Sequence, residues 1–272
     1  MSPSLVADCQ SCFALCCTAL PFARSADFAI DKPAGQPCPN LATDYRCRIH
    51  RDLKTTGFGG CVSFDCFGAG QHVSQGTFQG VSWRDADTAD ATAMFIAFDV
   101  MRQLHELLWY LADVRRRMPR DRPTIQLQSE IEQLTESSAI TLPHINLDLL
   151  RAAADDCMTR CSAAARSRHS KAKSLRGEDL LGRRLVQLKG AQLRGALLIA
   201  ADLSEQDLTD ADLLGADLRD ADLTAADLHE ALFLTQSQVN STRGDERTRL
   251  PDHLHRPAHW RRADSAVPGA QL

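Results

Sequence analysis

The sequence has 272 residues, of which 44% are apolar and 24% charged, and its net charge is −4. These proportions are ordinary for a globular protein and exclude a collagen-like or low-complexity chain. No apolar run reaches the ~18 residues of a membrane-spanning helix, and the first residues lack the basic and apolar regions of a signal peptide. We therefore expect a cytoplasmic protein with no membrane partner.

Cysteine is concentrated near the N-terminus, where eight of the ten cysteines lie within the first 66 residues. In a reducing cytosol such density favours metal ligation or redox chemistry over disulfides. Glycine and proline interrupt every candidate element, so the segment needs an internal staple to fold. The eight cysteines are Cys9, Cys12, Cys16, Cys17, Cys38, Cys47, Cys61 and Cys66.

The cysteine spacing suits a metal site with sulfur ligands. Cys9 and Cys12 form the two-residue chelate that is typical of zinc and iron–sulfur sites. Thiolates are soft donors, so they favour zinc or an iron–sulfur cluster over magnesium or calcium. His50 could replace one thiolate, and His72 is a weaker candidate. Two four-thiolate zinc sites, one zinc site with spare thiols, and iron–sulfur ligation all remain open.

This segment resembles the small zinc- or iron-chelating domains built on CxxCxxCC, then G-x-PC, then C-x-I-H/Y. Here three residues separate Cys12 from Cys16 where that family has two, and GFGGC replaces its later RP-x-x-C. The resemblance implies metal binding, with zinc as the first candidate and iron or an iron–sulfur cluster as the alternative. The implied ligands are Cys9, Cys12, Cys16, Cys17, Cys38, Cys47, His50, Cys61 and Cys66.

The middle of the chain predicts helices. Residues 89–117 place apolar side chains at steps of three and four, which indicates a long amphipathic helix. Further helices are expected over 124–136 and 145–168, with Pro143 between them. The stretch HELLWYL is close to the HExxH motif of zinc proteases, but Trp109 occupies the place of the second histidine. We therefore expect no protease site here.

Two further features follow. Cys157 and Cys161 stand four residues apart on one helix face, as small buried residues or as additional ligands. Residues 160–177 are basic and small, and we interpret them as a linker whose positive charge lies against the acidic region that follows. Nucleic-acid binding is not expected, because aromatic residues for base stacking are absent.

Leucine then recurs every five residues from Leu193 to Leu228, with Phe233 in the ninth position. Alanine stands two residues before each, except at Gln206. On an extended chain residues two apart face the same side, so alanine and leucine are predicted to be buried and the intervening aspartates exposed. A helix is excluded, because a step of five advances about 140° beyond a full turn and scatters the leucines around it.

These units resemble the pentapeptide-repeat family, whose A(D/N)Lxx units wind a right-handed quadrilateral β-helix. The resemblance implies that fold here, with residues 178–190 as a distorted first coil. Some members imitate duplex DNA to inhibit gyrase. Here little more than two coils, rising about 10–15 Å, are too short for that, although residues 191–234 hold ten acidic side chains against two arginines. We expect a terminal cap formed by Val239, Leu250, Leu254 and Trp260.

The prediction is therefore a mixed, multi-domain chain: residues 1–85 a cysteine-rich metal-binding domain, 86–174 a helical connector, 175–235 a pentapeptide-repeat β-helix and 236–272 a cap and tail. No catalytic constellation or organic cofactor site emerges. The leading hypothesis is a non-enzymatic metal-binding scaffold with an unknown protein partner, as a monomer or homodimer. The alternatives are an iron–sulfur or thiol-based redox protein or sensor and, less favoured, a gyrase inhibitor.

Overall fold

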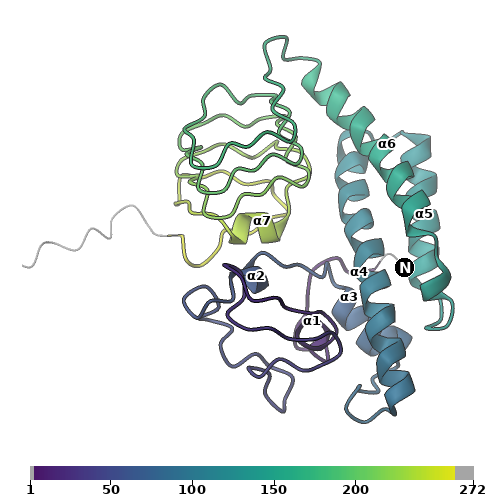
Figure 1. Ribbon diagram of the computed structural model, residues 1–272. Helices are drawn as coiled ribbons and strands as arrows, with labels where there is room; N and C mark the ends of the chain where they lie inside the picture. The colour runs from purple at the N-terminus through teal and green to yellow at the C-terminus, as the bar shows by residue number, and fades with distance from the viewer. Residues whose placement is uncertain (1–2, 261–272) are drawn as a thin grey trace, which may run out of the picture. The chain divides into compact units, whose positions relative to one another are not determined.

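The computed structural model describes residues 3–260 and divides the chain into two compact units, Met1–Cys161 and Ser162–Leu272. Their boundary falls within one helix, α6 (Leu147–Arg166). Figure 1 shows long helices in the first unit and stacked turns of chain in the second. Within the described residues, no helix combines the length and the apolar character needed to span a bilayer.

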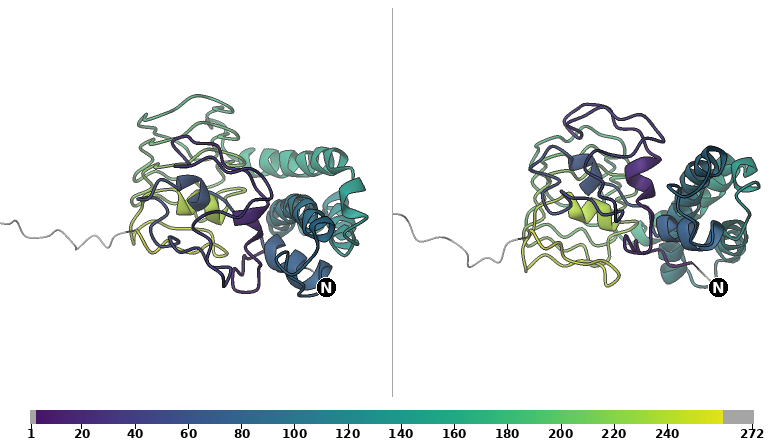
Figure 2. Two further views of the ribbon diagram at one scale, coloured as in Figure 1. Left: turned by 60° about the horizontal axis from the view of Figure 1, so that its bottom comes forward. Right: turned by 90° about the horizontal axis from the view of Figure 1, so that it is seen from below.

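The first unit begins with loops that carry three very short helices, α1 (Leu15–Thr18), α2 (Gly59–Val62) and α3 (Ala69–Gln71). A π-helix, η1 (His72–Thr77), follows α3 directly. Single antiparallel bridges pair the loops, and Figure 2 shows how little regular structure they contain. The small core of these loops consists of Ala14, Phe22, Cys38, Leu41 and Phe58.

Helices α4 (Thr88–Arg117) and α5 (Arg122–Thr135) form the framework of the first unit and pack along each other. Each starts at an aspartate whose side chain accepts a backbone N–H three residues on: Asp87 from Asp90 and Asp121 from Thr124. Such N-caps satisfy backbone donors that the helix leaves unpaired. α4 buries an apolar stripe that includes Phe98, which has no exposed surface.

The short 3-10 helix η2 (Leu142–His144) contains Pro143 and separates α5 from α6. The helices predicted over 89–117, 124–136 and 145–168 are confirmed, with ends shifted by two residues or fewer. Cys157 and Cys161 are buried on α6, 3% and 1% exposed. This matches their interpretation as small core residues.

In the second unit, turns of chain stack so that residues 20 apart lie side by side. Parallel bridges join Gln192 to Asp212 and Leu197 to Asp217, and the same step continues along the repeat. The predicted alanine and leucine positions from Ala191 to Leu228 are all buried. The first turn is shorter, because Ser174 pairs with Gln192 only 18 residues on. We call residues 174–234 the repeat stack.

The prediction of a quadrilateral β-helix is wrong, because residues 3–260 contain no β-strand and the repeat stack is paired only by isolated bridges. The physical reason lies in the backbone. One residue in every five has a φ near +60°, in the left-handed region, so no extended run is long enough to pair over consecutive residues. These residues are Gly190, Gly195, Ala200, Glu205, Asp210, Gly215, Asp220 and Ala225.

The aspartates of the repeat also differ from the expected solvated face, because each holds the turn that follows it. Asp222 accepts the backbone N–H of Thr224 at 2.9 Å, and Asp227 accepts that of His229 at 3.1 Å. Asp202, Asp207, Asp212 and Asp217 do the same two residues on. This local hydrogen bond is the reason aspartate suits the position.

The ends of the repeat stack are closed by the flanking chain. Before it, Arg168 and His169 both contact the buried carboxylate of Asp210, so the basic stretch does lie against an acidic group. After it, α7 (Gln236–Asn240) follows, and the Gln238 side chain donates to two carbonyls of the repeat. Of the four predicted cap residues, Val239, Leu254 and Trp260 are buried, and Leu250 is half-buried.

Candidate metal centre in the cysteine-rich segment

The predicted thiols sit on short turns of the first unit. Cys16 and Cys17 lie on α1, Cys61 lies on α2, and Cys66 directly precedes the turn into α3. None of the ten cysteines of the chain forms a disulfide. We describe the eight N-terminal thiols in two groups by the charges that act on each of them; Cys17 acts on members of both groups.

The first thiol group consists of Cys9, Cys12, Cys16 and Cys66. Their negative charges influence one another: Cys12 acts on Cys9 and Cys16, and Cys66 acts on Cys12 and Cys16. Gly70 brings two of them together, because the sulfurs of Cys12 and Cys66 both lie within 4 Å of the point where a side chain at Gly70 would begin.

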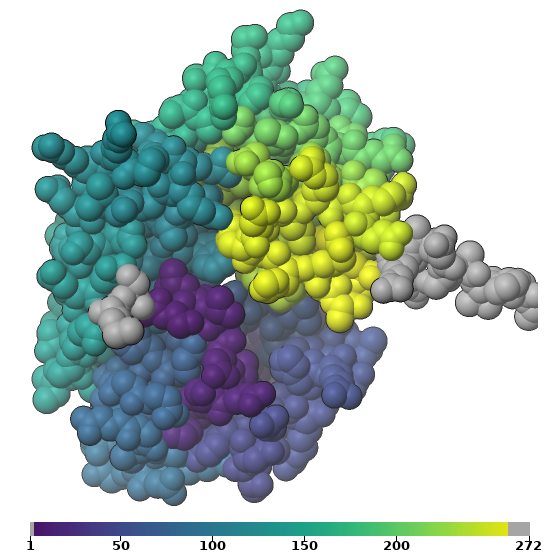
Figure 3. All heavy atoms as spheres, turned by 180° about the vertical axis from the view of Figure 1, so that it is seen from behind, coloured from purple at the N-terminus to yellow at the C-terminus, as the bar shows by residue number. Residues whose placement is uncertain are grey.

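Gln71, on α3, positions the first thiol group. Gln71 accepts the backbone N–H of Asp8 at 3.1 Å and donates to the Val6 carbonyl at 2.8 Å. Asp8 in turn accepts the backbone N–H of Gln10, which shapes the turn between Cys9 and Cys12. Figure 3 shows this N-terminal segment in purple against the blue surface of the residues that follow α2. Residues sixty positions apart in sequence are thereby held side by side.

The second thiol group consists of Cys17, Cys38, Cys47 and Cys61. Negative charge on the other three thiols raises the pKa of Cys61, and negative charge on Cys17 and Cys38 raises that of Cys47. Backbone contacts fix them: Cys38 N–H donates to the Cys17 carbonyl at 2.9 Å, and Cys47 forms a bridge with Leu41. The groups meet at α1, where the sulfurs of Cys16 and Cys17 are 3.9 Å apart.

Most of these thiols are neutral in the metal-free protein. Burial raises the pKa of Cys9, Cys12, Cys38, Cys47 and Cys66. It raises the pKa of Cys61 to about 12, with the neighbouring thiolates adding to the shift. Cys17 is the exception, because a hydrogen bond from Cys16 lowers its pKa. A metal would therefore have to displace protons as it binds.

The donor set fits zinc or iron in its chemistry, since each group offers four soft thiols. The distances are not yet those of a bound ion. Among residues 3–260, no three His, Cys, Asp or Glu side chains lie close enough together to hold a metal. Neighbouring thiolates on a tetrahedral zinc are about 3.8 Å apart, given Zn–S bonds of about 2.3 Å.

The histidines lie differently from the expectation. The His50 side chain is exposed and forms no hydrogen bond with a described residue, so its role as a ligand stays a prediction. His72 joins His105 instead, with His72 Nδ1 2.9 Å from His105 Nε2 and His105 Nδ1 2.7 Å from the Phe67 carbonyl. A carbonyl only accepts, so His105 donates to Phe67 and accepts from His72. The Nε2 atom of His72 is left as an acceptor.

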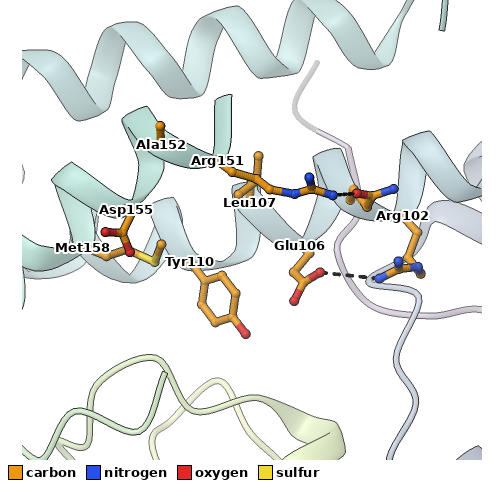
Figure 4. A pocket seen from close by; sticks show the side chains of 9 residues that line it. Arg102, Glu106, Leu107, Tyr110, Arg151, Ala152, Asp155 and Met158 are labelled. Carbon is orange, nitrogen blue, oxygen red and sulfur yellow. Dashed lines mark hydrogen bonds and ion pairs between the residues drawn. The ribbon is translucent and has the colours of Figure 1, made fainter. Parts of the chain in front are cut away.

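A separate cavity of about 550 Å³ lies between α4 and α6. Figure 4 shows Glu106 and Tyr110 directed to one side of α4, with the ion pair between Arg102 and Glu106 beside them. Burial raises the pKa of Glu106, and the guanidinium of Arg102 opposes this shift. The lining contains no cysteine or histidine among the described residues: Arg102, Gln103, Glu106, Leu107, Tyr110, Arg151, Ala152, Asp155 and Met158.

Comparison with known proteins extends over both units. The chain is 52% identical to the uncharacterized protein YybG of Bacillus subtilis (strain 168) over 269 residues, which cover 94% of this chain and 95% of the relative. The chain belongs to the YybG family. Eight copies of the pentapeptide repeat match residues 187–224, so the core of the repeat stack consists of pentapeptide repeats. The likeness of the cysteine-rich segment to the CxxCxxCC domains stays a prediction.

Sequence reasoning missed how the N-terminal thiols are placed relative to one another. Nothing in the cysteine spacing assigns each thiol to one of the two groups, because loops far apart in sequence decide that. The sequence also gives no sign that His105 is fully buried in a hydrogen-bond chain. The sequence gives no sign that Lys32 is buried, because it is a single lysine within a loop.

Proposed function

We propose that this member of the YybG family is a non-enzymatic, metal-binding scaffold or interaction protein. Its thiol groups take up zinc or iron, and its pentapeptide repeats form the framework against which a partner binds. One observation carries the proposal: eight thiols that form no disulfide lie within residues 9–66 of one compact unit, and their charges act on one another.

The poor core of the cysteine-rich segment supports a structural role for the metal. Within residues 13–61 one cluster of five buried side chains, one of them Cys38, forms a small core against which partly buried residues pack. Loops with so little apolar burial need a further cross-link, and no disulfide supplies it. Metal binding to four thiolates provides folding free energy directly. Zinc would supply this cross-link alone, whereas iron would add redox chemistry.

The test is metal content together with an absorption spectrum, on full-length protein purified without oxygen or chelator. Zinc without colour supports the structural role, and iron with visible bands supports the iron–sulfur alternative. A double variant, Cys38→Ser with Cys47→Ser, should lose one metal equivalent. The matched control is Cys157→Ala with Cys161→Ala on α6, which should keep full metal content. Protein that carries no metal under these conditions contradicts the proposal.

A thiol-redox function is the second candidate, favoured by the Cys16–Cys17 contact and by the lowered pKa of Cys17. Adjacent cysteines have Cα atoms about 3.8 Å apart, below the 4.4–6.8 Å of unstrained disulfides. A Cys16–Cys17 disulfide would therefore be strained and readily reduced. Mass spectrometry after mild peroxide treatment tests this candidate: a reversible loss of two hydrogen atoms at this pair, transferred to the peroxide as water forms, supports it, and irreversible over-oxidation opposes it.

The repeat stack is the proposed partner-binding part, and homodimerisation is one form this could take. Its surface aspartates bond locally or pair with basic neighbours, as Asp217 does with Arg219 at 2.6 Å. This use of the acid for turns and local ion pairs does not favour a DNA-mimic inhibitor. Absence of inhibition in a gyrase supercoiling assay at micromolar protein would exclude that function.

A further inference from the structure

The cavity between α4 and α6 lies wholly within the first unit, since every residue that lines it precedes Cys161. Its volume of about 550 Å³ falls within the ~300–1,000 Å³ of pockets that hold small molecules. The lining combines buried apolar side chains with charged side chains of both signs. The order of these side chains along the two helices indicates the class of molecule that fits.

Charge changes in the same order along both helices. Arg102 and Glu106 stand four residues apart on α4, and Arg151 and Asp155 stand four apart on α6, so each pair shares one helix face. Figure 4 shows the two pairs following each other in the same direction. The basic ends lie together, because Arg151 donates to the side chain of Gln103, the neighbour of Arg102. The cavity is therefore basic at one end and acidic next to it.

The remaining part of the lining is apolar and buried. Leu107 is 7% exposed, Tyr110 8% and Met158 5%. Arg151 and Asp155, in contrast, are exposed. Solvent thus reaches charged groups of the cavity, whereas its apolar side chains are covered. A ligand with a charged end and an apolar end would match this division.

Hydrogen-bonding groups at the charged end are incompletely used. Arg102 contacts Glu106 at 3.4 Å and Asp99 at 3.5 Å, longer than the ~2.7–2.9 Å of strong charge-assisted bonds. Its Nε atom is buried and has no hydrogen-bond partner within residues 3–260. Glu106 Oε1 also accepts no hydrogen bond from a described residue. A buried donor without a partner is costly, and a ligand carboxylate would supply the missing acceptor.

We infer that this cavity binds a free α-amino acid with an apolar side chain, in its zwitterionic form. Arg102 and Arg151 bind the carboxylate, which matches the fork of a guanidinium. Glu106 and Asp155 bind the ammonium, and the buried apolar residues contact the side chain. The inference is independent of the proposed metal binding, because no cysteine or histidine lines the cavity within the described residues.

The balance of charge favours a zwitterion over a simple anion or cation. The four charged residues of the lining are two arginines, one glutamate and one aspartate, so their formal charges cancel. A zwitterion answers both signs, whereas an anion would leave the carboxylates without a partner. The protonation of Glu106 agrees with this. Burial raises its pKa, positive charge on Arg102 and Arg151 opposes the shift, and a ligand ammonium would keep the carboxylate ionised.

The first experiment is isothermal titration of the full-length wild-type protein with L-leucine, L-methionine and L-phenylalanine. We expect saturable binding of one molecule per chain. Glycine should bind at least 10-fold more weakly, since it has no side chain to bury. Leucinamide, which lacks the carboxylate, and 4-methylpentanoate, which lacks the ammonium, should also lose at least 10-fold. If none of the amino acids binds, the inference is overturned. If either analogue binds as tightly as leucine, the zwitterion is wrong.

The second experiment places the ligand in this cavity. Arg102→Gln, Glu106→Gln and Asp155→Asn should each lower the affinity for leucine at least 10-fold. The matched control is Asp156→Asn, which removes an exposed carboxylate next to Asp155 that does not line the cavity. It should bind leucine like the wild-type protein.

Equal losses in Asp155→Asn and Asp156→Asn would show a general effect of charge and overturn the assignment. Unchanged affinity in all three cavity variants would place the amino acid elsewhere on the protein. Circular dichroism of each variant checks folding. Should the cavity variants fail to fold, the series of amino acids and analogues on the wild-type protein decides the inference.

Discussion

The aspartate of each repeat unit does two things at once, because its side chain is charged and also closes a turn. At Asp222 the carboxylate accepts the Thr224 N–H at 2.9 Å, next to a residue in the left-handed region at Ala225. Without that acceptor, a backbone donor of the turn would lose its partner. The hydrogen bond, and not the charge, is therefore the contribution of this residue to stability.

Asp222→Ala is expected to lower the free energy of unfolding of the second unit by about 1 kcal/mol, the size of a lost side-chain cap. Asp222→Asn keeps the acceptor oxygen and should cost much less. Urea unfolding followed by circular dichroism measures both. Equal losses in the two variants would mean that the charge matters more than the turn.

A second prediction at the scale of residues concerns His105 and the dependence of stability on pH. Burial lowers its pKa to about 4, below the ordinary value of 6.5. The unfolded chain therefore binds a proton at pH values where the folded protein does not. Stability should fall as the pH drops from 6.5 to 4, by about 3 kcal/mol from this group. Below pH 4 both states are protonated and the loss stops.

His105→Gln removes this titration and should flatten the pH profile of urea unfolding between pH 6.5 and 4. The measurement is made with chelator present, so that release of metal does not contribute. Some dependence of stability on pH should remain, because burial also lowers the pKa of His72. A neighbouring charge on Glu136 opposes that shift. A variant with the same slope as the wild-type protein would contradict the assignment to His105.

At the scale of elements, the sequence predicts what depends on local periodicity. Apolar steps of three and four located α4, and the five-residue step identified the buried leucines of the repeat stack. The predicted β-helix was wrong, because alternation predicts which side chains are buried but not which residues adopt the left-handed backbone conformation. Contacts between loops had no local signal, so the two thiol groups, Lys32 and the pair of His72 with His105 could not be found from spacing.

Gly70 tests whether α3 supports the first thiol group. A Cβ at this position would lie 2.7 Å from the Cys12 sulfur and 3.8 Å from the Cys66 sulfur. Gly70→Ala should therefore push Cys12 aside and remove one metal equivalent, with an overpacking cost of about 1–3 kcal/mol. Gly59→Ala on α2 is the control, since its nearest contact is 4.0 Å away. Full metal content in Gly70→Ala would show that the first group binds no metal.

At the scale of the whole molecule, the two units depend on different sources of stability. The second unit buries a continuous column of alanine and leucine from Ala191 to Leu228 and closes its end with α7. The cysteine-rich loops of the first unit have five core residues of their own and eight free thiols. Removal of metal should therefore affect one part of the chain and spare another.

Treatment of the full-length protein with a strong chelator should unfold residues 1–85 and leave residues 187–224 folded. Hydrogen exchange with mass spectrometry measures both regions in one sample, and re-addition of zinc should restore protection in the first. The repeat stack needs no metal, because backbone hydrogen bonds between residues about 20 apart and its buried leucines hold it. Loss of protection in both regions together would mean that the units fold as one. Unchanged protection in both would mean that the thiols do not stabilise the N-terminal loops through a metal.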